Sequence, residues 1–302
     1  MEPLLIQHHI AKTAGTSLRQ VTRANFAANE VADIERTFHL TRIPPDFHWE
    51  TVIRRARAAY QSLPADRRTG TRCFMGHAAP LLMAVIDDRP VRAFTMLRDP
   101  VERVVSLYRH AERQARAPAS ATGRWAPMAH AMRDRRLSLK DIYLSAESRS
   151  RDPGHEHLFR PFFNEQGGQI LLGVLDSREM PVTSDRASLE PYTRRALDIL
   201  SDRYVVGTQD HFSQSVRLFA DSFGWRTLFV PRANVRGESL PVDEETSALI
   251  RAYNAVDAEL HAHYEQRLAY LPGVGRVARL RGGTGHRARR RLAWARRAVA
   301  RP

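Results

Sequence analysis

Short apolar runs alternate with helix-period segments along most of the chain. Runs of strand length stand at 4–10, 72–77 and 91–98, and another begins the segment 204–212. Apolar residues at helical spacing predict helices at 16–25, 49–63, 137–146, 189–200 and 243–267, with further helices starting at 100 and ending at 223. Strands that alternate with helices are typical of parallel sheets. We therefore expect one α/β domain, with a mainly parallel central sheet flanked by helices.

The clearest helix start follows the run 91–98. Asp99 stands at the N-cap position, Pro100 at the first helical position and Glu102 three residues after the cap. This spacing predicts a capping box, in which the two acidic side chains bond each other's backbone N–H groups. The apolar face of the helix would consist of Val101, Val104, Val105 and Tyr108.

The run 4–10 is followed by a lysine and a stretch of small residues, and Thr16 and Ser17 are expected to cap the next helix. A helix N-terminus offers unpaired N–H groups and a positive dipole end, so this corner is typical of an anion site, most often for phosphate. In a Walker loop the lysine follows the last glycine, whereas Lys12 precedes Gly15 and no glycine lies upstream. This order disfavours an ordinary NTP-binding loop.

Length and composition are those of a globular protein, with 302 residues and 43% apolar side chains. The single cysteine, Cys73, excludes an intramolecular disulfide framework, and no apolar run approaches the ~18 residues of a membrane span. No signal-type segment precedes the first apolar run. We therefore expect a cytoplasmic protein, with a peripheral contact to a membrane surface as an alternative.

The formal net charge of +14 would by itself suggest a polyanion partner. Residues 276–302, however, contain ten arginines and no acidic residue, which leaves 37 basic and 33 acidic residues in the body. We therefore expect no specific nucleic-acid partner. The basic tail, 272–302, is interpreted as a solvated segment, with a basic helix that contacts an anionic surface as the alternative.

Only Lys12 and Lys140 are lysines, although the chain has 47 basic residues. Lysine at position 12 is therefore not a generic cation. A compact, mobile ammonium suits a position where charge develops on a leaving group better than a guanidinium does.

Residues 9–17, from His9 to Ser17, and residues 98–108, from Arg98 to Tyr108, form two motifs. Together they resemble motifs of the carbohydrate-type sulfotransferase family, of the heparan sulfate 2-O- and 6-O-sulfotransferase type. Residues 9–17 resemble the family's 5′-phosphosulfate loop, approximately H-I-P-K-T-G-G-T-S, with Ala11 in place of the usual proline. Ala14 stands where the family often has glycine, so we expect it to be accommodated without a positive φ. Residues 98–108 resemble the 3′-phosphate motif R-D-P-x-x-R-x-x-S-x-Y at every defined position.

The resemblance covers about residues 4–270 and implies a P-loop-like three-layer sandwich with the sulfotransferase fold. The sulfotransferase domain would be 1–271, with a variable acceptor-side region at 111–160. The implied donor is 3′-phosphoadenosine 5′-phosphosulfate (PAPS), without a metal, and the implied acceptor is a hydroxyl group of a carbohydrate or glycan. The reaction would be an in-line displacement.

The resemblance also implies roles for individual residues. Lys12 would neutralise the charge that grows on the bridging oxygen, and Arg98 and Ser106 would anchor the 3′-phosphate. His77 follows a glycine between the two motifs, where the 2-O-type enzymes carry their general base. Its catalytic role follows from that position, and an imidazole takes a proton near neutral pH. The 5′-phosphosulfate loop would comprise Ala11, Lys12, Thr13, Ala14, Gly15, Thr16 and Ser17.

Weaker similarities place other parts of the chain. The segments 163–173, 204–212 and 254–257 are similar to further stretches of the family, with Gln209 in place of a usual glutamate. By family position, 230–237 would be the adenine-side loop, with Arg232 and Asn234 as candidates. The spacing of His155 and His157 would suit two ligands of one metal ion, but no second group of ligands accompanies them in the sequence. A surface position, or a contact with the acceptor, is therefore favoured for these two histidines.

Alternatives remain for these residues and for the whole chain. In a purely structural interpretation, the imidazole of His77 would only form hydrogen bonds within a loop. In the same interpretation, Arg98 would form an ion pair with Asp99 or Glu102. The protein would otherwise be a small-molecule kinase that binds ATP at the first loop, or a non-catalytic module that binds a polyanion through its basic tail.

Overall fold

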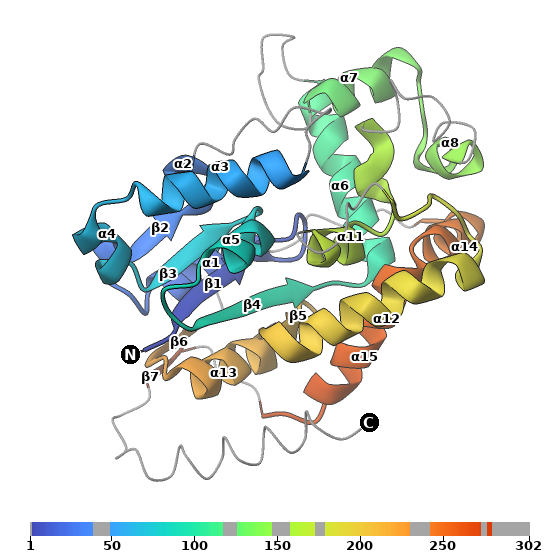
Figure 1. Cartoon of the computed structure of the whole chain (residues 1–302). Helices are drawn as coiled ribbons and strands as arrows, with labels where there is room; N and C mark the ends of the chain where they lie inside the picture. The colour runs from blue at the N-terminus through green and yellow to red at the C-terminus, as the bar shows by residue number, and fades with distance from the viewer. Residues whose placement is uncertain are drawn as a thin grey trace.

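A computed structural model describes residues 2–38, 49–116, 126–146, 158–172, 179–229, 242–272 and 277–279. Its centre is a five-stranded sheet in the order β2-β3-β1-β4-β5, in which every pairing is parallel (Figure 1). The strands are β1 Leu4–His8, β2 Val31–Asp33, β3 Cys73–Gly76, β4 Val91–Leu97 and β5 Tyr204–Thr208. The predicted α/β fold with a mainly parallel sheet is confirmed.

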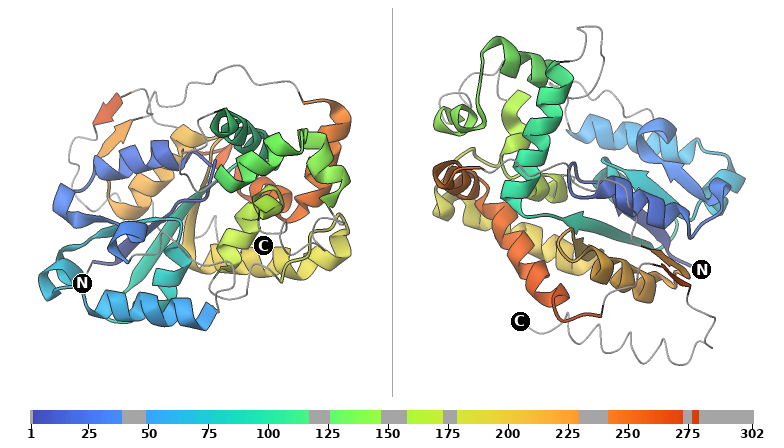
Figure 2. Two further views of the ribbon diagram at one scale, coloured as in Figure 1. Left: turned by 90° about the horizontal axis from the view of Figure 1, so that it is seen from above. Right: turned by 180° about the vertical axis from the view of Figure 1, so that it is seen from behind.

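Each strand buries alternate residues against helices on opposite faces of the sheet, as the two-residue period of a strand requires. Leu4 and Ile6 of β1 belong to one apolar cluster, and Leu5 belongs to another. The first cluster is covered by α3 Trp49–Gln61, α5 Ala79–Val85, α12 Arg186–Arg203 and α15 Ala255–Leu268. The second is covered by α1 Gly15–Arg23 and α13 Phe212–Phe223, which Figure 2 shows from behind.

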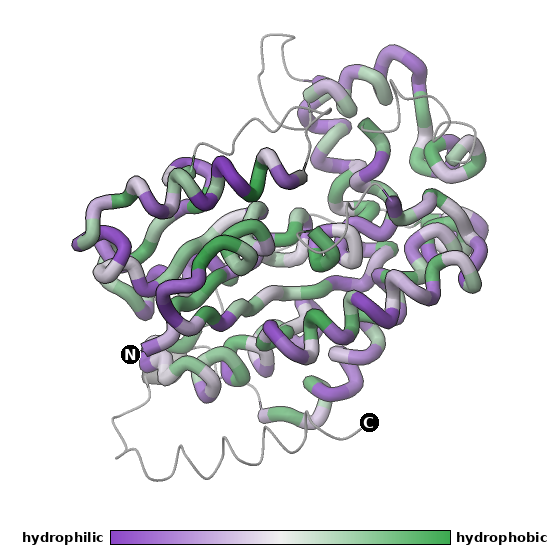
Figure 3. The backbone as a smooth tube through the Cα atoms, viewed as in Figure 1, coloured by the Kyte–Doolittle hydropathy of each residue, from purple (hydrophilic) through white to green (hydrophobic). Residues whose placement is uncertain are grey.

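A third apolar cluster lies beyond the carboxyl end of β4, among helices that do not cover the sheet (Figure 1). The long helix α6 Pro100–Ala115 leads out from β4 and packs against α7 Ala126–Asp134. In Figure 3 the strands of the central sheet are mostly apolar, whereas the outer helices present polar stripes. The helices α8 Leu139–Leu144 and α14 Glu244–Tyr253 complete this third cluster.

Shorter elements connect these layers. They are η1 Ala28–Glu30, α2 Ile34–Thr37, α4 Ala65–Gly70, η2 Arg160–Phe162, α11 Glu165–Leu171, β6 Thr227–Phe229 and β7 Val277–Arg279. The strand β7 lies in the segment that we expected to be a solvated tail, and it pairs antiparallel with β6. Residues 280–302 lie outside the described residues.

Two local predictions are wrong in an informative way. The helix predicted at 243–267 is broken at Asn254, whose side-chain amide donates to the carbonyl of Ile250 (2.9 Å) and so competes with the helical bond. The capping box is half made: the carboxylate of Asp99 accepts from the Glu102 N–H (3.0 Å), but the carboxylate of Glu102 bonds Arg98 instead. In the first case a side chain competes with the backbone for a carbonyl, and in the second a charged neighbour takes the carboxylate from the backbone N–H.

His8 makes the stability of the fold depend on pH. It is fully buried at the end of β1, and burial lowers the pKa of its imidazole from 6.5 to about 3. Between pH 6.5 and pH 3, His8 is protonated in the unfolded chain but stays neutral in the folded chain. The free energy of unfolding therefore falls as the pH is lowered from 6.5 toward 3. The folding equilibrium constant should lose up to about tenfold per pH unit from this group.

Replacement of this group by a neutral one should flatten that dependence. We expect His8→Gln to show a shallower decline in urea-derived stability between pH 6.5 and 4 than the parent. Parallel declines in the two proteins would show that other groups carry the acid sensitivity.

Candidate functional site

The predicted site residues gather at the carboxyl edge of the sheet. In this edge β1 lies between β3 and β4, so the loops that follow these three strands are neighbours. Lys12 lies in the first loop, His77 directly follows β3, and Arg98 directly follows β4. Open parallel sheets hold their ligands at this edge, because the loops there are free to present side chains and backbone N–H groups.

The loop between β1 and α1 reaches the helix through left-handed backbone conformations. Lys12 has φ 70° and Ala14 has φ 63°, so the expectation that Ala14 avoids a positive φ is wrong. Such a conformation costs an alanine about 1–2 kcal/mol. The conformation places Ala14 at the N-cap, where its carbonyl accepts from the Leu18 N–H (3.0 Å).

The prediction that Thr16 and Ser17 cap this helix is also wrong. The helix α1 begins at Gly15, one residue earlier, and its N-cap makes no side-chain hydrogen bond. The loop is closed instead by Thr13, whose hydroxyl donates to the carbonyl of Ile10 (3.0 Å). Within the loop, Lys12 and Ala14 are half-buried and Thr16 is exposed, whereas the remaining members, Ala11, Thr13, Gly15 and Ser17, are buried.

The first loop and the end of β3 are joined by two histidines. The ring of His9 stacks on that of His77, with centroids 4.4 Å apart and planes inclined by 20°. A Cβ atom on Gly15 would lie 1.8 Å from the His9 ring, so only glycine leaves room for this stack. The predicted base is thus held beside the start of α1 by a neighbour that the sequence analysis did not assign.

Glu35, from α2, organises the turn that carries His77. Its carboxylate accepts from the backbone N–H groups of His77 and Ala78, the latter at 3.2 Å. A Cβ atom on Gly76 would come within 2.4 Å of the same carboxylate. The glycine before the histidine therefore leaves room for Glu35, and the acceptor fixes the backbone from which His77 projects.

Cations gather around Lys12. Burial lowers the pKa of its ammonium, and the charges of Arg113 and Arg98 lower it further. The pKa of His110 is lowered by burial and then by Lys12 and Arg113. Helix α6 thus turns a face toward Lys12, and Ser106 shares that face because it lies four and seven residues before His110 and Arg113. Sequence analysis missed these two residues, although their spacing from Ser106 was a usable signal.

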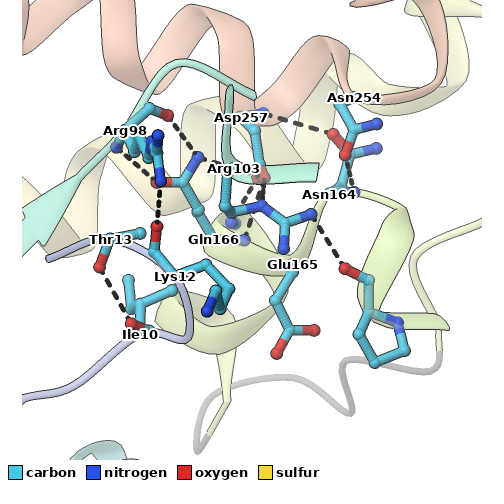
Figure 4. Close-up of polar contacts among 12 residues, drawn as sticks. Ile10, Lys12, Thr13, Arg98, Arg103, Asn164, Glu165, Gln166, Asn254 and Asp257 are labelled. Carbon is cyan, nitrogen blue, oxygen red and sulfur yellow. Dashed lines mark hydrogen bonds and ion pairs between the residues drawn. The ribbon is translucent and has the colours of Figure 1, made fainter. Parts of the chain in front are cut away.

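Arg98 connects the two motifs (Figure 4). Its guanidinium donates through Nη1 to the carbonyl of Lys12 (3.3 Å) and through Nε and Nη2 to the carboxylate of Glu102 (3.3 and 3.0 Å). The structural alternative, in which Arg98 pairs with Glu102, is therefore realised in this structure. Asp99 pairs elsewhere, with Arg251 at 3.1 Å.

A separate pocket of about 410 Å³ opens between α6 and α7, inside the region 111–160 in part. Arg116, Arg133 and Arg136 lie among its lining residues. Tyr108 and Glu112, which also line it, stand on a different face of α6 from Ser106 and His110, so we assign the pocket no part in the Lys12 site.

Some predicted residues lie outside the described residues, namely Arg232, Asn234, His155 and His157. Across the described ranges no cluster of three or more histidine, cysteine or acidic side chains has the arrangement of a metal site. In the same part of the chain, no helix has both the length and the apolar character that a membrane span needs.

The anchoring role of Glu35 can be tested directly. Glu35→Ala leaves two backbone N–H groups without this acceptor, so we expect a loss of about 1–3 kcal/mol in the free energy of unfolding, measured in urea. The exposed Glu259→Ala on α15 is the matched control and should change stability by less than about 0.5 kcal/mol. Equal stabilities of the two variants would contradict the role.

No protein-family model matches this chain, and no curated protein sequence matches it at a significant level.

Proposed function

We propose that the protein is a sulfotransferase that moves the sulfuryl group of PAPS to a hydroxyl group of a carbohydrate or glycan. The observation that carries the proposal is the bond from the Arg98 guanidinium to the Lys12 carbonyl, because it joins two anion-binding motifs from separate strands. One corner of the sheet then offers cationic groups to both phosphate positions of a single nucleotide. The proposal includes a P-loop-like sulfotransferase fold for the domain.

The charge distribution supports an anionic ligand. Lys12, Arg98 and Arg113 lie close enough for the two arginines to lower the pKa of the lysine. Like charges that are gathered and partly buried repel one another, and an anion between them would relieve that repulsion. The N-terminus of α1 adds backbone N–H groups and a positive dipole end to the same corner.

In the proposed reaction the acceptor oxygen attacks sulfur as the bond from sulfur to the bridging phosphate oxygen breaks. Lys12 and the N–H groups at the start of α1 would bind the 5′-phosphate, and Lys12 would neutralise the charge that develops on the bridging oxygen. His77 would take the proton from the acceptor hydroxyl. Arg98 and Ser106 would bind the 3′-phosphate and thereby fix the line of attack.

Glu102 has a place in this proposal. It bonds the Arg98 guanidinium, and a 3′-phosphate would compete with it for the same donors. The proposal places the reaction in the cytoplasm.

Nucleotide titration tests the proposal against its alternatives. Adenosine 3′,5′-bisphosphate, ADP and ATP would be titrated calorimetrically into the protein at one salt concentration. We expect a Kd of about 1 µM or lower for the bisphosphate, which is about −8 kcal/mol, and much weaker binding of the other two. Preference for ATP would indicate the kinase, and absence of nucleotide binding would favour the polyanion-binding module.

The role of Arg98 predicts a selective loss of affinity. Arg98→Ala should weaken binding of the bisphosphate by about 10- to 100-fold, as expected for a lost charge-assisted hydrogen bond, and should leave 5′-AMP almost unaffected. Glu102→Gln should strengthen binding of the bisphosphate, because the competing carboxylate is removed. The exposed Arg194→Ala on α12 controls for total charge. Unchanged bisphosphate affinity in Arg98→Ala would contradict the role.

The base is tested by comparing two histidines that lie at the same edge. His77→Ala should lower kcat by about 10²–10⁴-fold and should remove the acidic limb of the pH–rate profile. His110→Ala should keep that limb, since the proposal assigns His110 no proton transfer. The reverse result would move the base from His77 to His110.

A further inference from the structure

The main chain of Arg98 is held by one buried side chain from another part of the fold (Figure 4). The Arg98 N–H donates to Oε1 of Gln166 (2.8 Å), and Nε2 of Gln166 donates to the Arg98 carbonyl (2.9 Å). Gln166 belongs to α11 and has no exposed surface. Its amide thus replaces a neighbouring strand at the residue where the chain leaves β4 for α6.

Gln166 is itself fixed from α15. Asp257 accepts from the Gln166 N–H (3.1 Å), from its Nε2 (3.4 Å) and from the Gly167 N–H (2.8 Å). Arg103 of α6 lies with its Nε 3.8 Å from the same carboxylate, and its Nη2 donates to the carbonyl of Pro161 (2.9 Å). Arg103 and Asp257 are both completely buried, so this framework has little freedom to shift.

A second amide pair ties the same two helices together. The Asn164 N–H donates to Oδ1 of Asn254 (2.7 Å), and the Asp257 N–H donates to Oδ1 of Asn164 (3.3 Å). These residues belong to the segments 163–173 and 254–257 that the sequence analysis noted without a function. Their side chains are buried, and their bonds fix where Gln166 stands.

We propose that Gln166 is a positioning residue, which aims the Arg98 guanidinium at the 3′-phosphate position by holding the Arg98 main chain. The inference rests on the proposed function, since it assigns Gln166 to the selectivity of that site. A rotation of the Arg98 backbone would swing the end of a long side chain away from both the Lys12 loop and the phosphate. The two bonds from Gln166 prevent this rotation.

Glutamine is specific for this task. Its amide carries an acceptor oxygen and a donor nitrogen on the same carbon, which match the N–H and C=O groups of one residue. Glutamate lacks the donor and would place a second carboxylate beside Asp257. Methionine has nearly the same length and volume but can form neither bond. Gln166→Met therefore keeps the packing and removes the two hydrogen bonds to the Arg98 main chain.

The test measures selectivity for the 3′-phosphate. The Kd values of adenosine 3′,5′-bisphosphate and 5′-AMP would be measured for the parent, Gln166→Met and Gln166→Ala, with the exposed Gln61→Ala on α3 as control. We expect the ratio of the 5′-AMP Kd to the bisphosphate Kd to fall about tenfold in the Gln166 variants. The Kd of 5′-AMP should stay within about twofold of its value in the parent. An equal loss for both nucleotides, or an unchanged ratio, would overturn the inference.

A double variant separates positioning from general loosening. In the Arg98→Ala background, Gln166→Met should cause no further loss of preference for the bisphosphate over 5′-AMP. The guanidinium that Gln166 is proposed to position is absent from that background. A further loss of the same size would show that Gln166 acts by another route, and the inference would fail.

Amide exchange gives a readout without nucleotide. The Arg98 amide should exchange at least about tenfold faster in Gln166→Met than in the parent, because the N–H loses its acceptor. Unchanged exchange would overturn the inference even if nucleotide binding changes. A parent protein that does not prefer the bisphosphate over 5′-AMP would instead defeat the proposed function, whatever the exchange rates show.

Discussion

The site depends on a buried carboxylate. Asp257 has no exposed surface, and burial raises the pKa of its carboxyl, whereas Arg103 and the N–H groups around it lower the pKa. A charge in this position is tolerated only while its partners surround it, since an unpaired buried charge is strongly destabilising. The partners come from α6 and α11, so one requirement of charge burial holds α15, α6 and α11 in register around the end of β4.

The carboxyl edge of the sheet, next to the framework of Asp257, Arg103 and Gln166, differs from it in charge. Lys12, Arg98 and Arg113 are cations that lie near one another, and Glu102 forms an ion pair with Arg98. In the framework the opposite charges of Arg103 and Asp257 are buried side by side, whereas at the edge of the sheet positive charge is concentrated. This division separates the groups that hold the backbone from those that we propose bind a ligand. Arg98 stands at the boundary, with its main chain held by Gln166 and its guanidinium bonded to Glu102 and the Lys12 carbonyl.

Much of the fold could be predicted from residue pattern, because strand and helix periods are local properties. The four strand-length runs became β1, β3, β4 and β5, although β2 was too short to be recognised. The errors have particular causes. At Glu102 the carboxylate bonds the charged Arg98 rather than a backbone N–H, and at Asn254 the side chain accepts from the distant Asn164 N–H and donates to the Ile250 carbonyl. At Ala14 the loop adopts a left-handed backbone that alanine disfavours.

By itself the sequence predicted the order of the main strands and helices, the two motifs interpreted as anion-binding and the candidates Lys12, His77 and Arg98, since these rest on residue type and short-range spacing. Tertiary structure alone decided that β1 lies between β3 and β4, that Glu35 and His9 hold His77, and that Gln166 holds Arg98. Gln166 and Arg98 are 68 residues apart. No local pattern relates them, because the bond between them exists only after the sheet and helices have packed.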